Sequence, residues 1–284
     1  SAPPAAGRAA GSASGENSAI DVNNIYGVYI DDDMGSLDNK GTISAFASVG
    51  DAGGYQSYVC ANDVYGMYFD YSYTMGSFNN SGTISAAASA GSAGGDDSYA
   101  EASDVYAIYL NSDFEVTSFV NSGTISASAS AGNAGGTGSY VNVNNVFGVL
   151  FPDDVVSVTN TGTISATAVA GHASGEGSTV VVADVFGAAF SGGLGTLDNQ
   201  GTISAAARAG DNATIMRVAG LALEGDGLIN NSGTVRTQVT AGNNANISEV
   251  AGIGINNGTV TINNTGNIYV SINSTGVPAS PVIA

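Results

Sequence analysis

The chain has 284 residues, of which 10% are charged, and 24 acidic residues against 5 basic ones give a formal charge of −19. This balance argues against nucleic acid or an anionic membrane surface as a partner, because phosphate groups are neutralised by lysine and arginine. Cation binding or plain solubility fits it better. No apolar run approaches the roughly 18 residues that a membrane-spanning helix needs. Cys60 is the single cysteine, which excludes an intramolecular disulfide.

Residues 1–18 are rich in alanine, glycine and serine, a composition typical of a flexible tail or linker. If ordered, such a segment must lie against something, for example a neighbouring subunit. We expect the folded body to span residues 19–272 and a second tail to span residues 273–284.

From residue 20 onward the chain is a tandem repeat, marked by an Asn-x-Gly motif that occurs seven times. Its glycines stand at positions 41, 82, 123, 162, 201, 233 and 266, with spacings of 41, 41, 39, 39, 32 and 33 residues. Helical repeats are excluded because no segment shows a 3.6-residue apolar period. A propeller blade would need four strands per repeat, and three apolar tracts are present in each.

The first tract follows the glycine and alternates apolar and polar residues. In the second repeat Ile84, Ala86, Ala88 and Ala90 share one face, which predicts a strand. Gly91 then ends it, and a loop of variable length follows. The glycine of the motif itself, here Gly82, is expected to make the turn before the strand.

The second tract contains Val141, Val143, Val146 and Val149 in the fourth repeat. The three-residue gap after Val143 breaks the alternation and predicts a bend or bulge. An Asn or Asp occupies the bend in the first five repeats, and these residues tolerate left-handed backbone. They are Asn24, Asp63, Asp104, Asn145 and Asp184.

A short third tract precedes each repeated asparagine. Its apolar residue stands two positions before the asparagine, so in a strand both side chains point inward. Three strands per repeat predict an all-β, single-domain parallel β-helix of about seven coils. The preference of parallel crossovers makes it right-handed. Stacked asparagine amides can hydrogen-bond along the axis, which predicts a structural ladder. The ladder consists of Asn39, Asn80, Asn121, Asn160, Asn199, Asn231 and Asn264.

Two rows of aromatic residues are predicted on the outer face. Stacked rings could bind sugars or another chain; alternatively, a loop covers them or they stack on themselves. The first row is Tyr26, Tyr65, Tyr106, Phe147 and Phe186, and the second is Tyr29, Tyr68 and Tyr109.

Acidic residues cluster in the loops after the second tract. Calcium could relieve their repulsion, but no spacing matches a known calcium loop, and solvated acidic loops are the simpler interpretation. The weak candidates are Asp31, Asp32, Asp33, Asp153 and Asp154. We expect no other cofactor.

The Asn-x-Gly-Thr-Ile-Ser motif, followed by Val-Tyr/Phe-Gly, resembles passenger domains of bacterial autotransporters and related surface adhesins over residues 20–272. An asparagine ladder is also similar to that of pectate lyase-like helices. The resemblance implies a right-handed β-helix at the bacterial surface or outside the cell, adhesive or self-associating. The membrane barrel of an autotransporter is not part of this sequence.

An enzyme is not expected. A polysaccharide lyase, the remote alternative, would combine clustered aspartates with a basic residue, and the five basic residues are scattered. His172 lies alone in a glycine-rich loop, and Cys60 has no histidine near it in the repeat.

Two functions remain. Uncapped solenoid ends expose strand edges, so copies of the chain could join head to tail into fibres, with both tails crossing the joint. Alternatively, an adhesin would bind a glycan or a host surface protein through its loops or aromatic rows.

Overall fold

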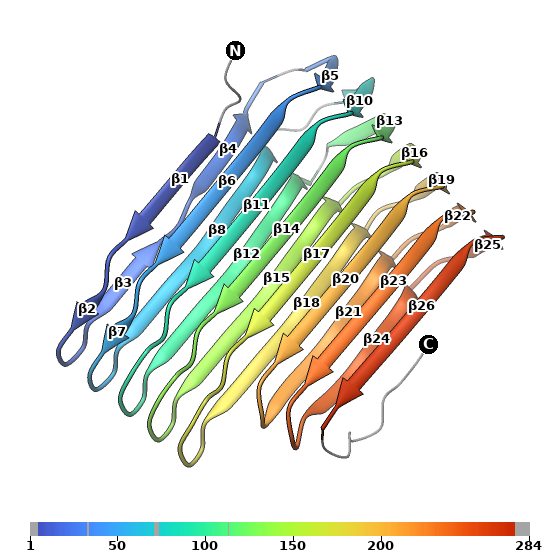
Figure 1. Cartoon of the computed structure of the whole chain (residues 1–284). Coiled ribbons are helices and arrows are strands. Elements are labelled where there is room, and N and C mark those ends of the chain that lie inside the picture. Colours follow the sequence, from blue (N-terminus) through green and yellow to red (C-terminus); the bar gives the residue numbers. More distant parts are fainter. Residues whose placement is uncertain (1–4, 33, 71–73, 113, 276–284) are drawn as a thin grey trace.

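The structure, a computed structural model, describes residues 5–32, 34–70, 74–112 and 114–275. Within those ranges the chain forms strands, turns and loops, and no helix; there is accordingly no helical segment that could cross a membrane. Equivalent strands of successive repeats lie side by side, so that the repeats stack along one axis (Figure 1).

The first tract forms what we call the small-residue sheet. Ile84, Ala86, Ala88 and Ala90 are buried and alternate with partly exposed residues, as the period of two predicted. Its strands, in order across the sheet, are β1 (Ala5–Ala10), β6 (Thr42–Val49), β11 (Thr83–Ala90), β14 (Thr124–Ala131), β17 (Thr163–Ala170), β20 (Thr202–Ala209), β23 (Thr234–Ala241) and β26 (Asn267–Ser274).

The second tract forms the bent sheet. Its strands are β3 (Ala19–Val22), β4 (Ile25–Ile30), β8 (Tyr58–Phe69), β12 (Tyr99–Leu110), β15 (Tyr140–Phe151), β18 (Thr179–Phe190), β21 (Ala213–Leu223) and β24 (Asn246–Ile255). The predicted bend is confirmed, because all five Asn and Asp residues of that row have a positive φ. Arg217 and Glu249 continue the row with φ values of 54° and 53°.

The third tract forms the short sheet, which closes each turn. Its strands are β5 (Ser36–Asn39), β10 (Ser77–Asn80), β13 (Glu115–Asn121), β16 (Val155–Asn160), β19 (Leu194–Asn199), β22 (Gly227–Asn231) and β25 (Val260–Asn264), with β9 (Thr74–Met75) beside β13. Two loops add the pair β2 (Ala13–Ser14) and β7 (Ala52–Gly53).

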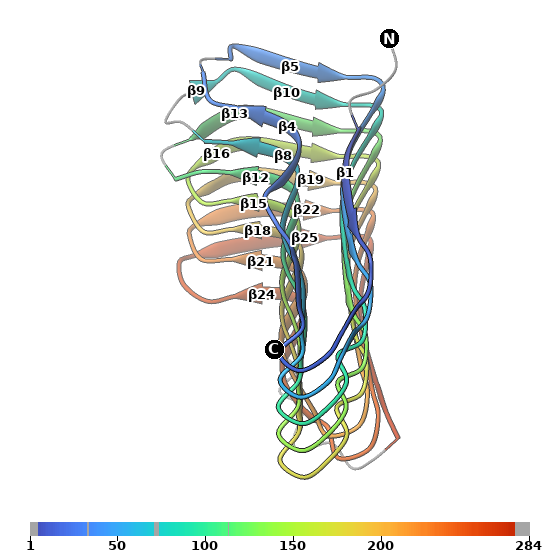
Figure 2. The same ribbon diagram turned by 90° about the vertical axis from the view of Figure 1, so that its left-hand side faces the viewer.

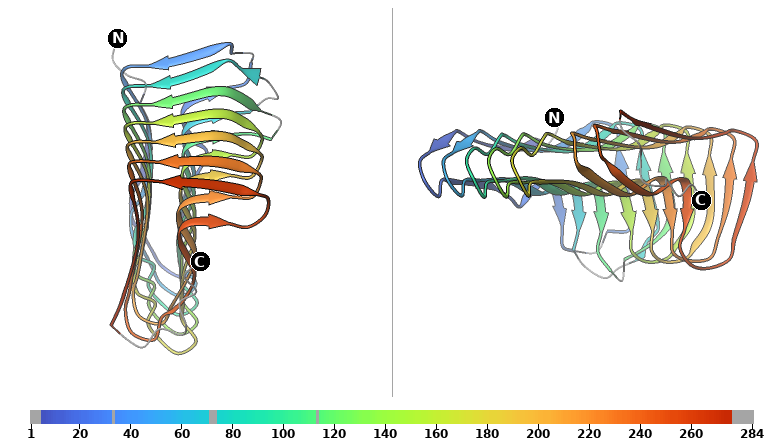
Figure 3. Two further views of the ribbon diagram at one scale, coloured as in Figure 1. Left: turned by 90° about the vertical axis from the view of Figure 1, so that its right-hand side faces the viewer. Right: turned by 90° about the horizontal axis from the view of Figure 1, so that it is seen from below.

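Seen along the stack, each turn outlines an L (Figures 2 and 3). The first half of each bent strand faces the small-residue sheet, and the second half turns away beneath the short sheet. All strand pairs are parallel and equivalent residues face each other, for example Ile84 with both Ile43 and Ile125, with one register shift between Leu194 and Thr196 where β19 pairs with β22. The predicted parallel β-solenoid with three strands per turn is therefore confirmed, whereas its handedness and number of coils stay predictions.

The interior is one continuous apolar core that runs the length of the stack. Phe78 and Phe119 of the short sheet stack with their ring centroids 4.7 Å apart, and both are buried. Ile125 of the small-residue sheet and Val105 of the bent sheet have no exposed surface. A single repeat could not bury these faces, so stability depends on the stacking.

The asparagine ladder is confirmed. Each amide Nδ2 donates to Oδ1 of the equivalent residue in the next repeat, over 2.7–2.9 Å, from Asn39 through to Asn264. Asn121, Asn160 and Asn199 have no exposed surface. Buried amides at the corner are thus satisfied by one another, as buried polar groups require.

The motif requires glycine for a reason other than the predicted turn. Its φ lies outside the left-handed region, but a Cβ on Gly123 would lie 2.1 Å from the carbonyl oxygen of Gly82. Real Cβ atoms do not approach that closely. The residue must be glycine because two backbones meet there, except at Gly41, where nothing lies within 4 Å.

The predicted N-terminal tail is partly wrong. Ala5–Ala10 form β1, which pairs with β6, and Ala13–Ser14 form β2. Small side chains let β1 continue the small-residue sheet, with Ala6 and Ala10 packed on the core. At the other end β26 reaches Ser274, two residues beyond the predicted boundary; the rest of that predicted tail, residues 276–284, lies outside the described part of the chain.

Candidate interaction surfaces

The two predicted aromatic rows lie on the outer face of the bent sheet, in a cluster separate from the core. Their rings stack from repeat to repeat with centroids 5.1–5.5 Å apart, except that Phe186 is tilted by 44° against Phe147, and the two rows meet edge to face. Stacking covers the ring faces: Tyr106 and Phe147 are 8% and 9% exposed, whereas Tyr29, in the first repeat, is 46% exposed. Within the rows the rings are therefore each other's partners.

The tyrosine hydroxyls of the first row reach back to the bend. Tyr65 donates to Asp63 and Tyr106 to Asp104, over 3.4 Å and 3.5 Å, and Tyr29 of the second row donates to Asp70. Burial is the main cause that raises the pKa of Tyr65 and of Tyr106. These phenols are therefore neutral donors.

Both rows stop before the end of the solenoid. Phe186 is followed in the same row by Ala219 and Ala251. In the other row Leu150 replaces tyrosine and is followed by Ala189, Ala222 and Gly254. One face of the Phe186 ring thus has an alanine beyond it where every earlier ring of that row has an aromatic neighbour.

A groove of about 660 Å³ opens where the rings stop. Its floor is formed by alanines of β18, β21 and β24, and Phe186, Phe147 and Leu150 line one side. The sequence analysis missed this site. The feature of the sequence that indicates this groove is the loss of aromatic residues after Phe186.

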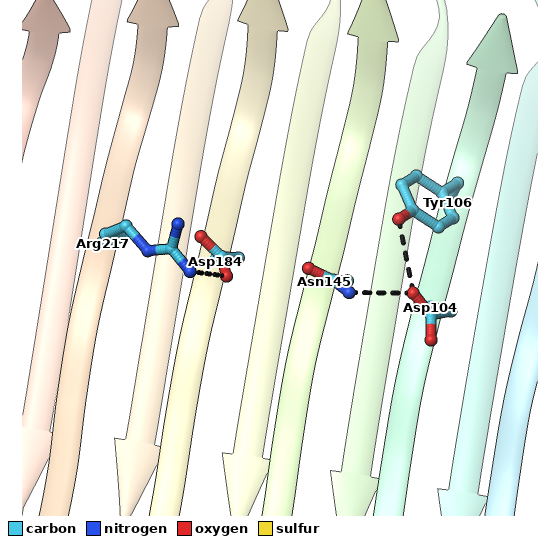
Figure 4. Close-up of polar contacts among 5 residues, drawn as sticks. All are labelled: Asp104, Tyr106, Asn145, Asp184 and Arg217. Atoms are coloured by element: carbon cyan, nitrogen blue, oxygen red, sulfur yellow. Dashed lines mark hydrogen bonds and ion pairs between the residues drawn. The ribbon is translucent and has the colours of Figure 1, made fainter. Parts of the chain in front are cut away.

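The last four residues of the row at the bend, Asn145, Asp184, Arg217 and Glu249, line one end of this groove. Figure 4 shows the polar contacts of this row from Asp104 to Arg217. Asn145 donates to Asp104 over 2.9 Å, and Arg217 forms an ion pair with Asp184. Burial raises the pKa of Asp184, and Arg217 opposes the rise. Further back, burial raises the pKa of Asp63, and the charge of the neighbouring Asp104 adds to the rise.

Glu224, Ser191 and Asn256 line the groove at the ends of the strands. Glu249 stands beside Arg217 in the row at the bend. The groove thus has an apolar floor, one open ring face and polar groups at both ends.

Two acidic residues in loops have a structural role, because each accepts a hydrogen bond from the backbone of the next repeat. Asp154 accepts a 2.6 Å hydrogen bond from the backbone N–H of Gly193 in the next repeat, and Asp51 does the same for Ser92. Asp31 and Asp32 are exposed, Asp153 is partly exposed, and Asp33 lies outside the described residues. Across the described ranges no three His, Cys, Asp or Glu side chains gather in a way that could hold a metal ion.

The two residues considered for catalysis occupy different parts of the fold: Cys60 lies in a strand, and His172 lies in the loop of another repeat. Cys60 is buried, and burial is the main cause that raises the pKa of its thiol to about 12. Such a thiol is unreactive at neutral pH, since the thiolate is the nucleophile. His172 is exposed in its loop, where Nδ1 accepts a long 3.5 Å hydrogen bond from the backbone of Asp211.

The C-terminal end of the solenoid exposes residues that point into the core elsewhere. Ile262 and Ile268 are each 40% exposed, whereas Ile229 and Val235, one repeat earlier in the same rows, have no exposed surface. Within the described residues, β24, β25 and β26 each have a strand on one side and an open edge on the other.

The N-terminal end is stepped. Because of β1, the small-residue sheet has one more strand in its stack than the short sheet, which begins with β5, or the bent sheet, which begins with β3 and β4. Arg8 of β1 is exposed and pairs with Ala47, in a row that faces the core in later repeats. An inward-pointing charge limits which edges can join there.

Comparison with known proteins adds nothing to this geometry: neither a protein-family model, nor a curated protein, nor a solved structure matches the chain.

Proposed function

We propose that this chain is an extracellular structural protein of the bacterial surface that joins end to end into fibres. The observation that carries the proposal is the exposed core at the C-terminal end, where Ile262 and Ile268 lie 40% exposed in rows that are otherwise buried. Covering them with another turn of solenoid would bury apolar surface, which is the main favourable term in association.

The open edges supply the matching hydrogen bonds. β24, β25 and β26 present unpaired backbone groups, and strand addition satisfies such groups with another chain. A second copy carries the same three tracts, so its N-terminal strands have the right spacing and the right alternation of side chains.

The asparagine ladder gives the joint a direction. Because every amide donates toward the next repeat, the ladder leaves acceptor capacity on Asn39 and donor capacity on Asn264. In a head-to-tail contact the donor end of one copy faces the acceptor end of the next, whereas contact between two like ends brings two donors or two acceptors together. This polarity favours a heterologous joint, the kind that forms open filaments.

The step at β1 fixes the register of the joint. If β1 pairs with β26 of the preceding copy, the small-residue sheet continues across the joint. The bent sheets of the two copies are then separated by a space one strand wide, and so are their short sheets. Arg8 then lies at that gap, where unpaired carbonyl groups of the strand edges are acceptors for its guanidinium.

The test is electron microscopy of the purified chain at increasing concentration. We expect fibres whose length grows with concentration. The double variant Ile262→Lys/Ile268→Lys should give single short rods, because it places charges on the exposed end. Its matched control is Val156→Lys, since Val156 is 62% exposed on the side of the solenoid. Isolated rods from the unmodified chain, or fibres from the double variant, would overturn the proposal.

A further inference from the structure

We propose that the groove beyond Phe186 binds a neutral, β-linked hexopyranose oligosaccharide. This site is separate from the ends of the solenoid and does not depend on fibre formation. Three regularities of the repeat are broken together at this place: the first aromatic row stops, the second row shrinks to alanine, and the residue at the bend is no longer Asn or Asp.

The first step concerns the open ring face. Phe186 ends a row of stacked rings whose successive centroids lie 5.1–5.4 Å apart; its own ring is tilted by 44° against Phe147, and Ala219 stands where the next ring would be. A flat apolar body placed over Ala219 would extend that stack. The apolar face of a pyranose ring meets this requirement, and aromatic rings are suited to such contacts because one end can stay apolar and the other wet.

The second step concerns the floor. Ala219 and Ala251 are 3% and 6% exposed, and Ala189 in the second row is 6% exposed. They form an apolar surface that spans three adjacent strands, β18, β21 and β24. The volume of about 660 Å³ lies within the usual range for ligand sites, roughly 300–1,000 Å³.

The third step concerns the polar rim. Asp184, Glu224 and Glu249 supply carboxylate acceptors, and Arg217 supplies a planar set of donors. Sugar hydroxyls donate and accept at once, so both kinds of group can be used. Three carboxylates against one guanidinium, on a chain of formal charge −19, disfavour acidic sugars.

The conformation of Arg217 is the fourth observation. Its φ of 54° is unusual for arginine, whereas the first five repeats place Asn or Asp at this position. Residues held in the left-handed region outside glycine and Asx cost energy and tend to gather at ligand sites. Here the cost places a guanidinium at the end of the groove, paired with Asp184.

A peptide fits less well. Peptides that dock on sheets pair with an open strand edge, whereas β21, at the centre of the floor, already has β18 and β24 on its two sides. A bound peptide would therefore find no main-chain partner over most of the groove.

The test is isothermal titration calorimetry of the full chain with three β-1,4-linked probes: cellohexaose, chitohexaose and mannohexaose. Binding of at least one is expected. Ala219→Phe should weaken that binding about tenfold or more, as loss of a central contact does, because the new ring continues the stack and fills the groove. Arg217→Asn should weaken it too, and it keeps a residue suited to the bend.

Arg208→Asn is the matched control, since it removes the same charge from an exposed position of β20 outside the groove. It should leave the affinity unchanged. Absence of binding to all three probes, or equal affinity of Ala219→Phe and the unmodified chain, would overturn the proposal. A circular dichroism spectrum and a thermal unfolding midpoint of Ala219→Phe that match those of the unmodified chain separate this outcome from a failure of folding.

Discussion

The first five repeats and the last two share an interior but differ on the outer face. The asparagine ladder and the core rows run without a break from the first repeat to the last. The first aromatic row and the Asx residues at the bend, by contrast, end with the fifth repeat, and the second aromatic row ends with Tyr109 in the third. The difference teaches that stacking constrains the inside of each turn strictly, whereas the outside is free to change where something other than the next repeat can cover it.

The largest effect should come from the middle of the asparagine ladder. Asn121→Ala leaves the donor of Asn80 and the acceptor of Asn160 buried and unpaired, which should cost about 3 kcal/mol of unfolding free energy. Asn264→Ala, at the exposed end, should cost less than about 0.5 kcal/mol. Urea denaturation measures both, and equal losses would show that the ladder is not what stabilises the interior.

A second comparison uses the glycines of the motif. Gly123→Ala drives a Cβ against the carbonyl oxygen of Gly82, so we expect a loss of about 2 kcal/mol, typical of overpacking. Gly41→Ala meets nothing within 4 Å and should be close to neutral. Thermal unfolding of the two variants checks this; a cost at Gly41 as large as at Gly123 would assign the glycine to the turn after all.

The outer face can be returned to the pattern of the earlier repeats. Arg217→Asn relieves the left-handed strain but also removes the ion pair with Asp184, whose side chain is only 14% exposed, so the net rise in stability should be smaller than about 1 kcal/mol. A rise measured by urea denaturation, together with weaker oligosaccharide binding, would identify a residue kept for binding at the expense of stability. A fall in stability would mean that the ion pair with Asp184 outweighs the strain.

The smallest effect concerns the charges at the bend. Because the folded chain raises the pKa of Asp63, it binds more protons than the unfolded chain between the ordinary and the raised pKa, so stability falls as pH rises through that window. Asp63→Asn removes this term and should add about 0.5 kcal/mol at neutral pH. The gain should vanish below the ordinary carboxyl pKa, and denaturation at a series of pH values measures it; a gain independent of pH would exclude the charge as its cause.

The sequence by itself determined the solenoid. Strand periodicity and the Asn-x-Gly motif are local signals repeated seven times, and the Asx residues at the bend recur five times; repetition makes a weak local signal specific. It also predicted which side chains of β11 face inward and that the ladder amides pair.

Only the tertiary structure decided what happens between repeats and at their ends. The need for Gly123 depends on the backbone of Gly82 beside it, and the role of Ala5–Ala10 depends on the free edge of β6. The groove exists because two rows of small residues run side by side across the same strands, beside the last ring and Arg217. Such juxtapositions join residues that are 30 to 40 positions apart, and the physical reason they stay hidden in the sequence is that no single repeat contains them.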